Sequence, residues 1–120
     1  MNWRKVGENH EGRAASYFER LGWDLISRNY SCRAGEVDLI FADREGAIIF
    51  VEVKFRSRSD YGLGQEFVDF RKQSRMAKAA LFYIKQKNLE SRNFRFDVAA
   101  LSPEGLEHIP NAFSPEGYTL

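Results

Sequence analysis

The chain has 120 residues, of which 43% are hydrophobic and 29% are charged. This composition is typical of a globular protein and excludes a disordered one. The length predicts a single domain over residues 1–120, built around one hydrophobic core. The formal net charge is +1, which by itself favours neither an acidic nor a basic partner.

The cysteine content and the hydropathy narrow the class of protein further. One cysteine, Cys32, excludes an internal disulfide and a cysteine-based zinc site. The first residues (MNWRKVGE) contain no apolar signal core, and no stretch approaches about 18 consecutive apolar residues, the length that spans a membrane. We therefore expect a cytoplasmic protein without a membrane partner.

The first third of the chain predicts a helix followed by a strand. Small and apolar side chains recur at helical spacing over residues 8–21, and Gly22 is suited to end this helix. Residues 23–30 predict a strand, and residues 31–35 predict a loop.

Two apolar segments then predict a β-hairpin. Residues 37–42 and 48–55 are rich in Val, Ile and Phe, and residues 43–46 (DREG) favour a turn. If the hairpin loop contains an odd number of residues, Asp38 faces Glu52 directly, with Cβ atoms roughly 4.5–5.5 Å apart.

The rest of the chain predicts a second helix and further strands. Residues 57–64 are polar and contain glycine, which favours a loop. An apolar stripe predicts a helix over about 66–87, followed by strands over 93–101 and 106–109, whereas the tail 110–120 is weakly patterned. This order of elements predicts an α/β fold with a central mixed β-sheet flanked by helices.

Three charged residues interrupt the predicted hairpin. Glu52 and Lys54 point to one face of their strand because side chains alternate along a strand, and Asp38 lies on the partner strand. Two close carboxylates repel each other unless one is protonated or a cation lies between them. Mg²⁺ binds oxygen ligands and is often held by one or two carboxylates. Asp38, Glu52 and the carbonyl of Val53 therefore predict a site for Mg²⁺ or Mn²⁺, beside which Lys54 could orient a water or stabilise negative charge.

The alternative is that Asp38, Glu52 and Lys54 form a structural ion pair on a solvated sheet face, which the dense apolar residues around these side chains disfavour.

Two other acidic residues are candidates for the same site. Glu11 shares a helical face with small and apolar residues and is expected to lean toward the core; the alternative is a carboxylate near a helix start, stabilised by the helix dipole. Glu36 is either a neighbour of the metal ligands or an exposed glutamate at a strand end.

Basic residues are concentrated in the second predicted helix. Residues 66–87 hold six basic and two acidic side chains, a difference of +4. A face of this kind would contact phosphates, and a solvated basic face is the alternative. The predicted nucleic-acid contacts are Arg71, Arg75 and Lys78 on the basic face, Lys72 and Gln73 on the same helix, and Arg56 and Arg58 after the hairpin. Because Lys72 and Gln73 lie closer to the apolar stripe, we expect them to be neighbours of the active site.

Three residues with reactive side chains receive no functional role. His10 and His108 lack the spacing of a zinc site. Asp97 is interpreted as structural.

Taken together, these motifs resemble the PD-(D/E)XK nuclease superfamily and, more narrowly, the YraN-like family of small bacterial proteins. The resemblance covers most of the chain. It rests on Glu11 with Ala14 and Ala15, 28–30 (RNY), 35–40 (GEVDLI), 50–54 (FVEVK) with Arg56, Lys72 with Gln73, 95–98 (RFDV) and 111–113 (NAF).

The resemblance implies a restriction-endonuclease-like core and a metal-dependent endonuclease that acts on DNA, including branched DNA, in preference to RNA. It assigns catalytic positions to Asp38, Glu52 and Lys54, and Glu11 resembles a first-helix glutamate that some members direct at the metal. One departure is that Val37 precedes Asp38 where the superfamily motif has proline. A non-catalytic module that binds nucleic acid or another partner is the alternative, and a homodimer is compatible with either function.

Overall fold

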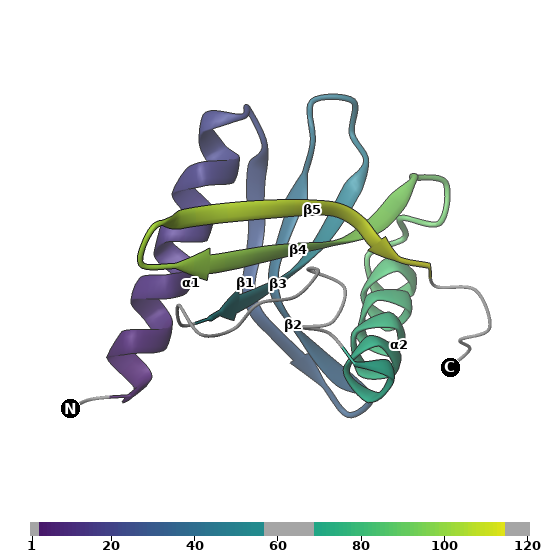
Figure 1. Cartoon of the computed structure of the whole chain (residues 1–120). Helices are drawn as coiled ribbons and strands as arrows, with labels where there is room; N and C mark the ends of the chain where they lie inside the picture. Colours follow the sequence, from purple (N-terminus) through teal and green to yellow (C-terminus); the bar gives the residue numbers. More distant parts are fainter. Residues whose placement is uncertain (1–2, 57–68, 115–120) are drawn as a thin grey trace.

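The computed structural model describes residues 3–56 and 69–114 (Figure 1). The elements are helix α1 (Trp3–Arg20), strands β1 (Asp24–Cys32), β2 (Gly35–Ala42) and β3 (Ile48–Phe55), helix α2 (Phe70–Gln86), and strands β4 (Phe94–Ser102) and β5 (Gly105–Phe113). Within the described ranges, no helix combines the length and the apolarity that a membrane-spanning segment needs.

The strands of the described residues form one mixed sheet in the order β1-β2-β3-β4-β5. Strands β3 and β4 are parallel, and the other three neighbouring pairs are antiparallel. Parallel neighbours require a crossover connection, and α2 lies within the one between β3 and β4. The prediction of an α/β fold with a mixed sheet and flanking helices is confirmed.

The two helices cover opposite faces of the sheet, and each face has its own hydrophobic cluster (Figure 1). On the α1 face, Phe18 packs with Phe41; on the α2 face, Met76 packs with Phe50 and Phe96. Burial of each large apolar side chain contributes about 1.5–3 kcal/mol. Because the middle of β3 is buried on both faces, its sequence is a continuous apolar run instead of an alternating one.

Short-range signals determine where α2 begins and how β2 pairs with β3. The side chain of Asp69 caps α2 by accepting the backbone N–H of Lys72 at 2.8 Å. In the hairpin, Asp43 Oδ1 accepts the backbone N–H groups of Glu45 and Ala47 at 3.0 and 2.8 Å. The loop between β2 and β3 therefore spans residues 43–47, an odd number.

Several element boundaries differ from the sequence predictions. Helix α1 begins at Trp3, earlier than residue 8. Strand β1 continues to Cys32 and β2 begins at Gly35, so the predicted loop at 31–35 shrinks to a two-residue turn. Strand β5 ends at Phe113, which places the first part of the predicted tail in the sheet.

The end of β5 was missed because this edge strand is irregular. Its register against β4 shifts between Phe96 and Val98, and Asn111 has a φ of +51°. Such an irregularity interrupts the two-residue alternation on which strand prediction depends, and proline, as at Pro110, is tolerated at a sheet edge.

Candidate functional site

Asp38 and Glu52 lie where β2 and β3 stop pairing. The paired register ends with Leu39 opposite Val51, so the next residue on each strand is one of the two acids. Here Asp38 Oδ2 accepts the backbone N–H of Val53 at 2.8 Å. The structure thus places a carboxyl from each strand at this point.

Glu52 is a buried carboxyl with an unsatisfied oxygen. The residue is 5% exposed, and its Oε1 lies 3.3 Å from Lys72 Nζ. Its Oε2 is buried and accepts no hydrogen bond from any described residue. Burial, followed by the negative charge of Asp38, raises the pKa of Glu52 to about 8 in spite of the opposing ammonium of Lys72. Because its pKa is raised, Glu52 holds a proton at neutral pH, and a bound cation could take the place of that proton.

Helix α2 reaches this site because Gly35 allows a close approach to β2. A Cβ atom at Gly35 would collide with the backbone carbonyl of Arg75. Figure 1 shows the β1–β2 turn lying beside the amino-terminal end of α2. Lys72, one turn before Arg75, extends its Nζ to Glu52 Oε1 at 3.3 Å and to Glu36 Oε1 at 3.7 Å.

Lys72 is therefore the basic residue in contact with the buried carboxyl. Its own burial would lower the pKa of the ammonium, but Glu52, with smaller contributions from Asp38 and Glu36, outweighs that effect and the pKa is raised. The lysine stays charged. Sequence analysis placed Lys72 close to the site, as a nucleic-acid contact, and the ion pair with Glu52 is an addition from the structure.

The other two predicted catalytic residues are Lys54 on β3 and Glu11 on α1. Lys54 is exposed on β3. Glu11 is half-buried on α1, next to His10, whose ring stacks on Phe55 at the end of β3 with centroids 4.4 Å apart. Among the described residues, no three or more His, Cys, Asp or Glu side chains are grouped to hold a metal ion. The role of Glu11 at the metal site therefore stays a prediction.

The predicted nucleic-acid contacts on α2 are mostly exposed. Arg71, Arg75 and Lys78 are exposed, and Gln73 is half-buried. Arg75 also lies 3.8 Å from Glu36 Oε1. The helix therefore presents a basic surface next to the carboxyl pair.

Of the two arginines predicted to contact nucleic acid after the hairpin, only Arg56 lies within the described residues. Arg56 is half-buried and forms an ion pair with Glu107 of β5, with Nη2 and Oε1 separated by 3.2 Å. Arg58 lies outside the described residues.

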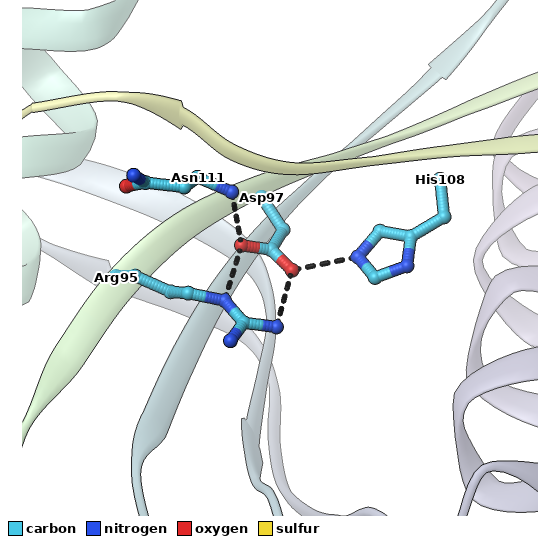
Figure 2. Close-up of polar contacts among 4 residues, drawn as sticks. All are labelled: Arg95, Asp97, His108 and Asn111. Atoms are coloured by element: carbon cyan, nitrogen blue, oxygen red, sulfur yellow. Dashed lines mark hydrogen bonds and ion pairs between the residues drawn. The ribbon is translucent and has the colours of Figure 1, made fainter.

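A second polar cluster lies on the α1 face of the sheet (Figure 2). Asp97 is 0% exposed, and it receives two hydrogen bonds from Arg95 at 2.9 and 3.2 Å and one from the backbone N–H of Asn111 at 3.0 Å. His108 Nε2 lies 2.7 Å from Asp97 Oδ2. Burial would raise the pKa of Asp97, but His108, Arg95 and the Asn111 N–H together lower it.

Because both oxygens of Asp97 are fully engaged, this cluster supports the irregular part of β5 and offers no free ligand. His108 had been given no role, and its contact with Asp97 is a finding of the structure. The contact between Arg95 and Asp97 could be predicted from the sequence, because two residues that are two positions apart on a strand point to the same face. The position of His108 depends on the register of β5.

A family model described as "Uncharacterised protein family UPF0102" matches residues 10–101, a span that includes Asp38, Glu52 and Lys72. A UPF0102 protein of Sulfurihydrogenibium sp. (strain YO3AOP1) is 38% identical over 116 residues, which cover 97% of this chain and 100% of the relative. UPF0102 proteins of Syntrophus aciditrophicus and Trichlorobacter lovleyi are 46% and 44% identical over 113 residues, covering 91% and 90% of this chain and 88% and 89% of the relatives.

Proposed function

The chain belongs to the uncharacterised protein family UPF0102, and from the carboxyl pair of β2 and β3 we propose that it is a metal-dependent endonuclease with a restriction-endonuclease-like core. One observation carries this proposal. Glu52 is buried beside Asp38 with an oxygen that lacks a hydrogen-bond partner among the described residues. A carboxyl in that position is costly unless it is protonated or neutralised by a cation.

The donor set fits Mg²⁺ or Mn²⁺. Both ions accept carboxylate oxygens, and Mg²⁺ commonly keeps several waters while it binds one or two protein carboxylates. Asp38 and Glu52 would hold the ion, with the carbonyl of Val53 as a third oxygen and Glu11 as the further support that the family resemblance implies. A bound divalent ion supplies polarisation of the phosphate and acidification of a water.

The chain's own basic residues would handle the substrate. Lys54, exposed beyond Glu52 on β3, would orient the attacking water or stabilise the charge that develops on the phosphate. Arg71, Arg75 and Lys78 would contact the phosphate backbone of DNA, which we favour over RNA. The remaining proposed contacts are Lys72, Gln73, Arg56 and Arg58, with Glu36 as a neighbour of the metal ligands.

Titration of Mg²⁺ and Mn²⁺ into the purified protein, with a panel of linear and branched DNA, tests this proposal. Cleavage should saturate with metal and fall to background in Glu52→Gln. The matched control is Glu45→Gln, which removes an exposed carboxylate at the opposite end of the same hairpin and should cleave like the wild type. Metal-dependent cleavage that survives in Glu52→Gln would contradict the assignment of the site.

The same panel distinguishes the enzyme from a non-catalytic module. Such a module would bind DNA with a steep dependence on salt concentration, because phosphate contacts release counterions, yet would cleave no substrate at any metal concentration. Sedimentation of the protein with and without DNA would establish whether a homodimer forms.

A further inference from the structure

Lys72 occupies a position between a buried and an exposed carboxylate. Its Nζ lies 3.3 Å from Glu52 Oε1 and 3.7 Å from Glu36 Oε1, and the side chains of the two glutamates are 6% and 48% exposed. The lysine side chain itself is 31% exposed. Its backbone is held in the first turn of α2 by the Asp69 cap, with a bond of 2.8 Å. The ammonium therefore has a buried partner and an outer partner within reach of one anchored residue.

Charge balance makes this ammonium a competitor of a metal ion. In the metal-binding state, in which both carboxyls are ionised, Asp38 and Glu52 carry two negative charges and Lys72 adds one positive charge. A divalent cation would bring this group to a net +1 with the lysine in place, and to zero once the lysine has left. Uncompensated charge in a buried site is costly, and Glu52 Oε1 already faces the lysine.

We propose that Lys72 is a resident cation of the carboxyl pair, which a divalent metal ion displaces from Glu52 toward Glu36 and the basic face of α2. This inference rests on the proposed metal site. It adds that metal loading frees a positive charge at the protein surface. Metal loading and the binding of a phosphate would then favour each other, since the same step neutralises the carboxyls and exposes the ammonium.

Lysine labelling tests the displacement without any substitution at Lys72. The wild-type protein is treated briefly with an amine-reactive acetylating reagent, with and without saturating Mn²⁺, and the modified sites are quantified by mass spectrometry. Lys72 should react several-fold faster in the presence of Mn²⁺. Lys85, exposed near the end of the same helix, serves as the internal control and should react equally in both samples.

Direct measurement of Mn²⁺ affinity provides the second test, by calorimetry or by the loss of the free-ion paramagnetic resonance signal. Lys72→Met should bind Mn²⁺ several-fold more tightly than the wild type, because the competing cation is gone. Lys85→Met, which removes an exposed lysine near the end of the same helix, should bind like the wild type.

The outcomes separate the two proposals. Unchanged Lys72 labelling and unchanged Mn²⁺ affinity in Lys72→Met would overturn the displacement, while Mn²⁺ binding that depends on Asp38 would leave the metal site standing. Faster labelling and tighter Mn²⁺ binding without cleavage of any DNA would support the displacement and contradict the nuclease. Absence of Mn²⁺ binding in all of these proteins would overturn both.

Discussion

The backbone N–H of Val53 donates to Asp38 Oδ2 at 2.8 Å, so a carboxyl of β2 is anchored by β3 where the two strands part. Glu52, its neighbour, has no such anchor on Oε2 among the described residues. The two acids are therefore unequal: Asp38 is oriented by the backbone, whereas Glu52 is buried and faces the ammonium of Lys72. Because of this difference, substitutions can separate the contributions of charge and of geometry to metal binding.

Asp38→Asn should weaken Mn²⁺ binding while it preserves the fold. The asparagine oxygen can still accept the Val53 N–H, but the charge is lost, and we expect the affinity to fall by at least about tenfold, or ~1.4 kcal/mol. Asp38→Ala should in addition lose the hydrogen bond, which contributes about 0.5–1.5 kcal/mol to stability. Calorimetric titration and thermal denaturation of both variants measure the two effects. Wild-type Mn²⁺ affinity in Asp38→Asn would contradict the metal assignment.

The stability of the metal-free protein should decrease as the pH rises from about 4.5 to about 8. The pKa of Glu52 is raised from its ordinary 4.5 to about 8 in the folded state, so the folded protein holds a proton that the unfolded chain has already released. The free energy of unfolding then falls with pH across this window, by an amount on the order of a few kcal/mol, and levels off above it.

Denaturant unfolding at several pH values, compared between wild type and Glu52→Gln, isolates this effect. The difference between the two proteins should vary with pH in the stated direction, because glutamine does not titrate. Saturating Mn²⁺ should flatten the wild-type curve, since metal binding competes with the proton. A difference that is constant between pH 5 and 8 would show that Glu52 titrates normally.

The carboxyl pair could be predicted because local rules determine it. Side chains alternate along a strand, and the odd loop at 43–47 brings Asp38 opposite Glu52. The contact of Lys72 with Glu52 depends on how closely α2 packs on β2, which a residue distant in sequence, Gly35, controls.

The Asp97 cluster depends on the sheet in a different way. Asp97 meets His108 because β5 pairs with β4 in a register that sets His108 opposite Ala99, and Asn111, at the register shift, reaches the same carboxylate with a left-handed backbone. Neither feature follows from periodicity. Tertiary packing and edge-strand irregularity therefore mark the limit of what this sequence could predict.

Gly35→Ala should separate α2 from the carboxyl pair. The added methyl group would collide with the carbonyl of Arg75, and overpacking of this kind typically costs about 1–3 kcal/mol. Because the helix must move, the contact between Lys72 and Glu52 should weaken as well, and amine labelling of Lys72 should increase in the metal-free protein.

Gly12→Ala is the matched control for this substitution. A Cβ atom at Gly12 meets nothing within 4 Å, and alanine in a helix interior is favoured over glycine by about 0.5–1 kcal/mol. We expect Gly12→Ala to be as stable as the wild type or more stable, with unchanged labelling of Lys72. Equal stability of the two variants would mean that α2 does not depend on the close approach at Gly35.

Asp97→Asn should destabilise the protein strongly without affecting the metal site. Asparagine keeps the shape and can still accept one N–H, but it removes the charge that Arg95, whose side chain is 33% exposed, and His108 face. Loss of a hydrogen bond to a charged group costs about 1.5–3 kcal/mol. Glu107→Gln, which removes the exposed partner of Arg56, should change stability by only about 0–1 kcal/mol.

Acid unfolding gives an independent measure of the Asp97 cluster. The pKa of Asp97 is lowered from its ordinary 3.8, so its contribution to stability is complete above that pH and is lost as the pH falls through the lowered value. The wild type should therefore lose stability steeply below about pH 4, whereas Asp97→Asn should have a lower stability at neutral pH and a shallower decline with acid.

Because Asp97 lies on the α1 face and the carboxyl pair faces α2, the Mn²⁺ affinity of the folded variant should equal that of the wild type. Weaker Mn²⁺ binding in folded Asp97→Asn would show instead that the two faces of the sheet are coupled.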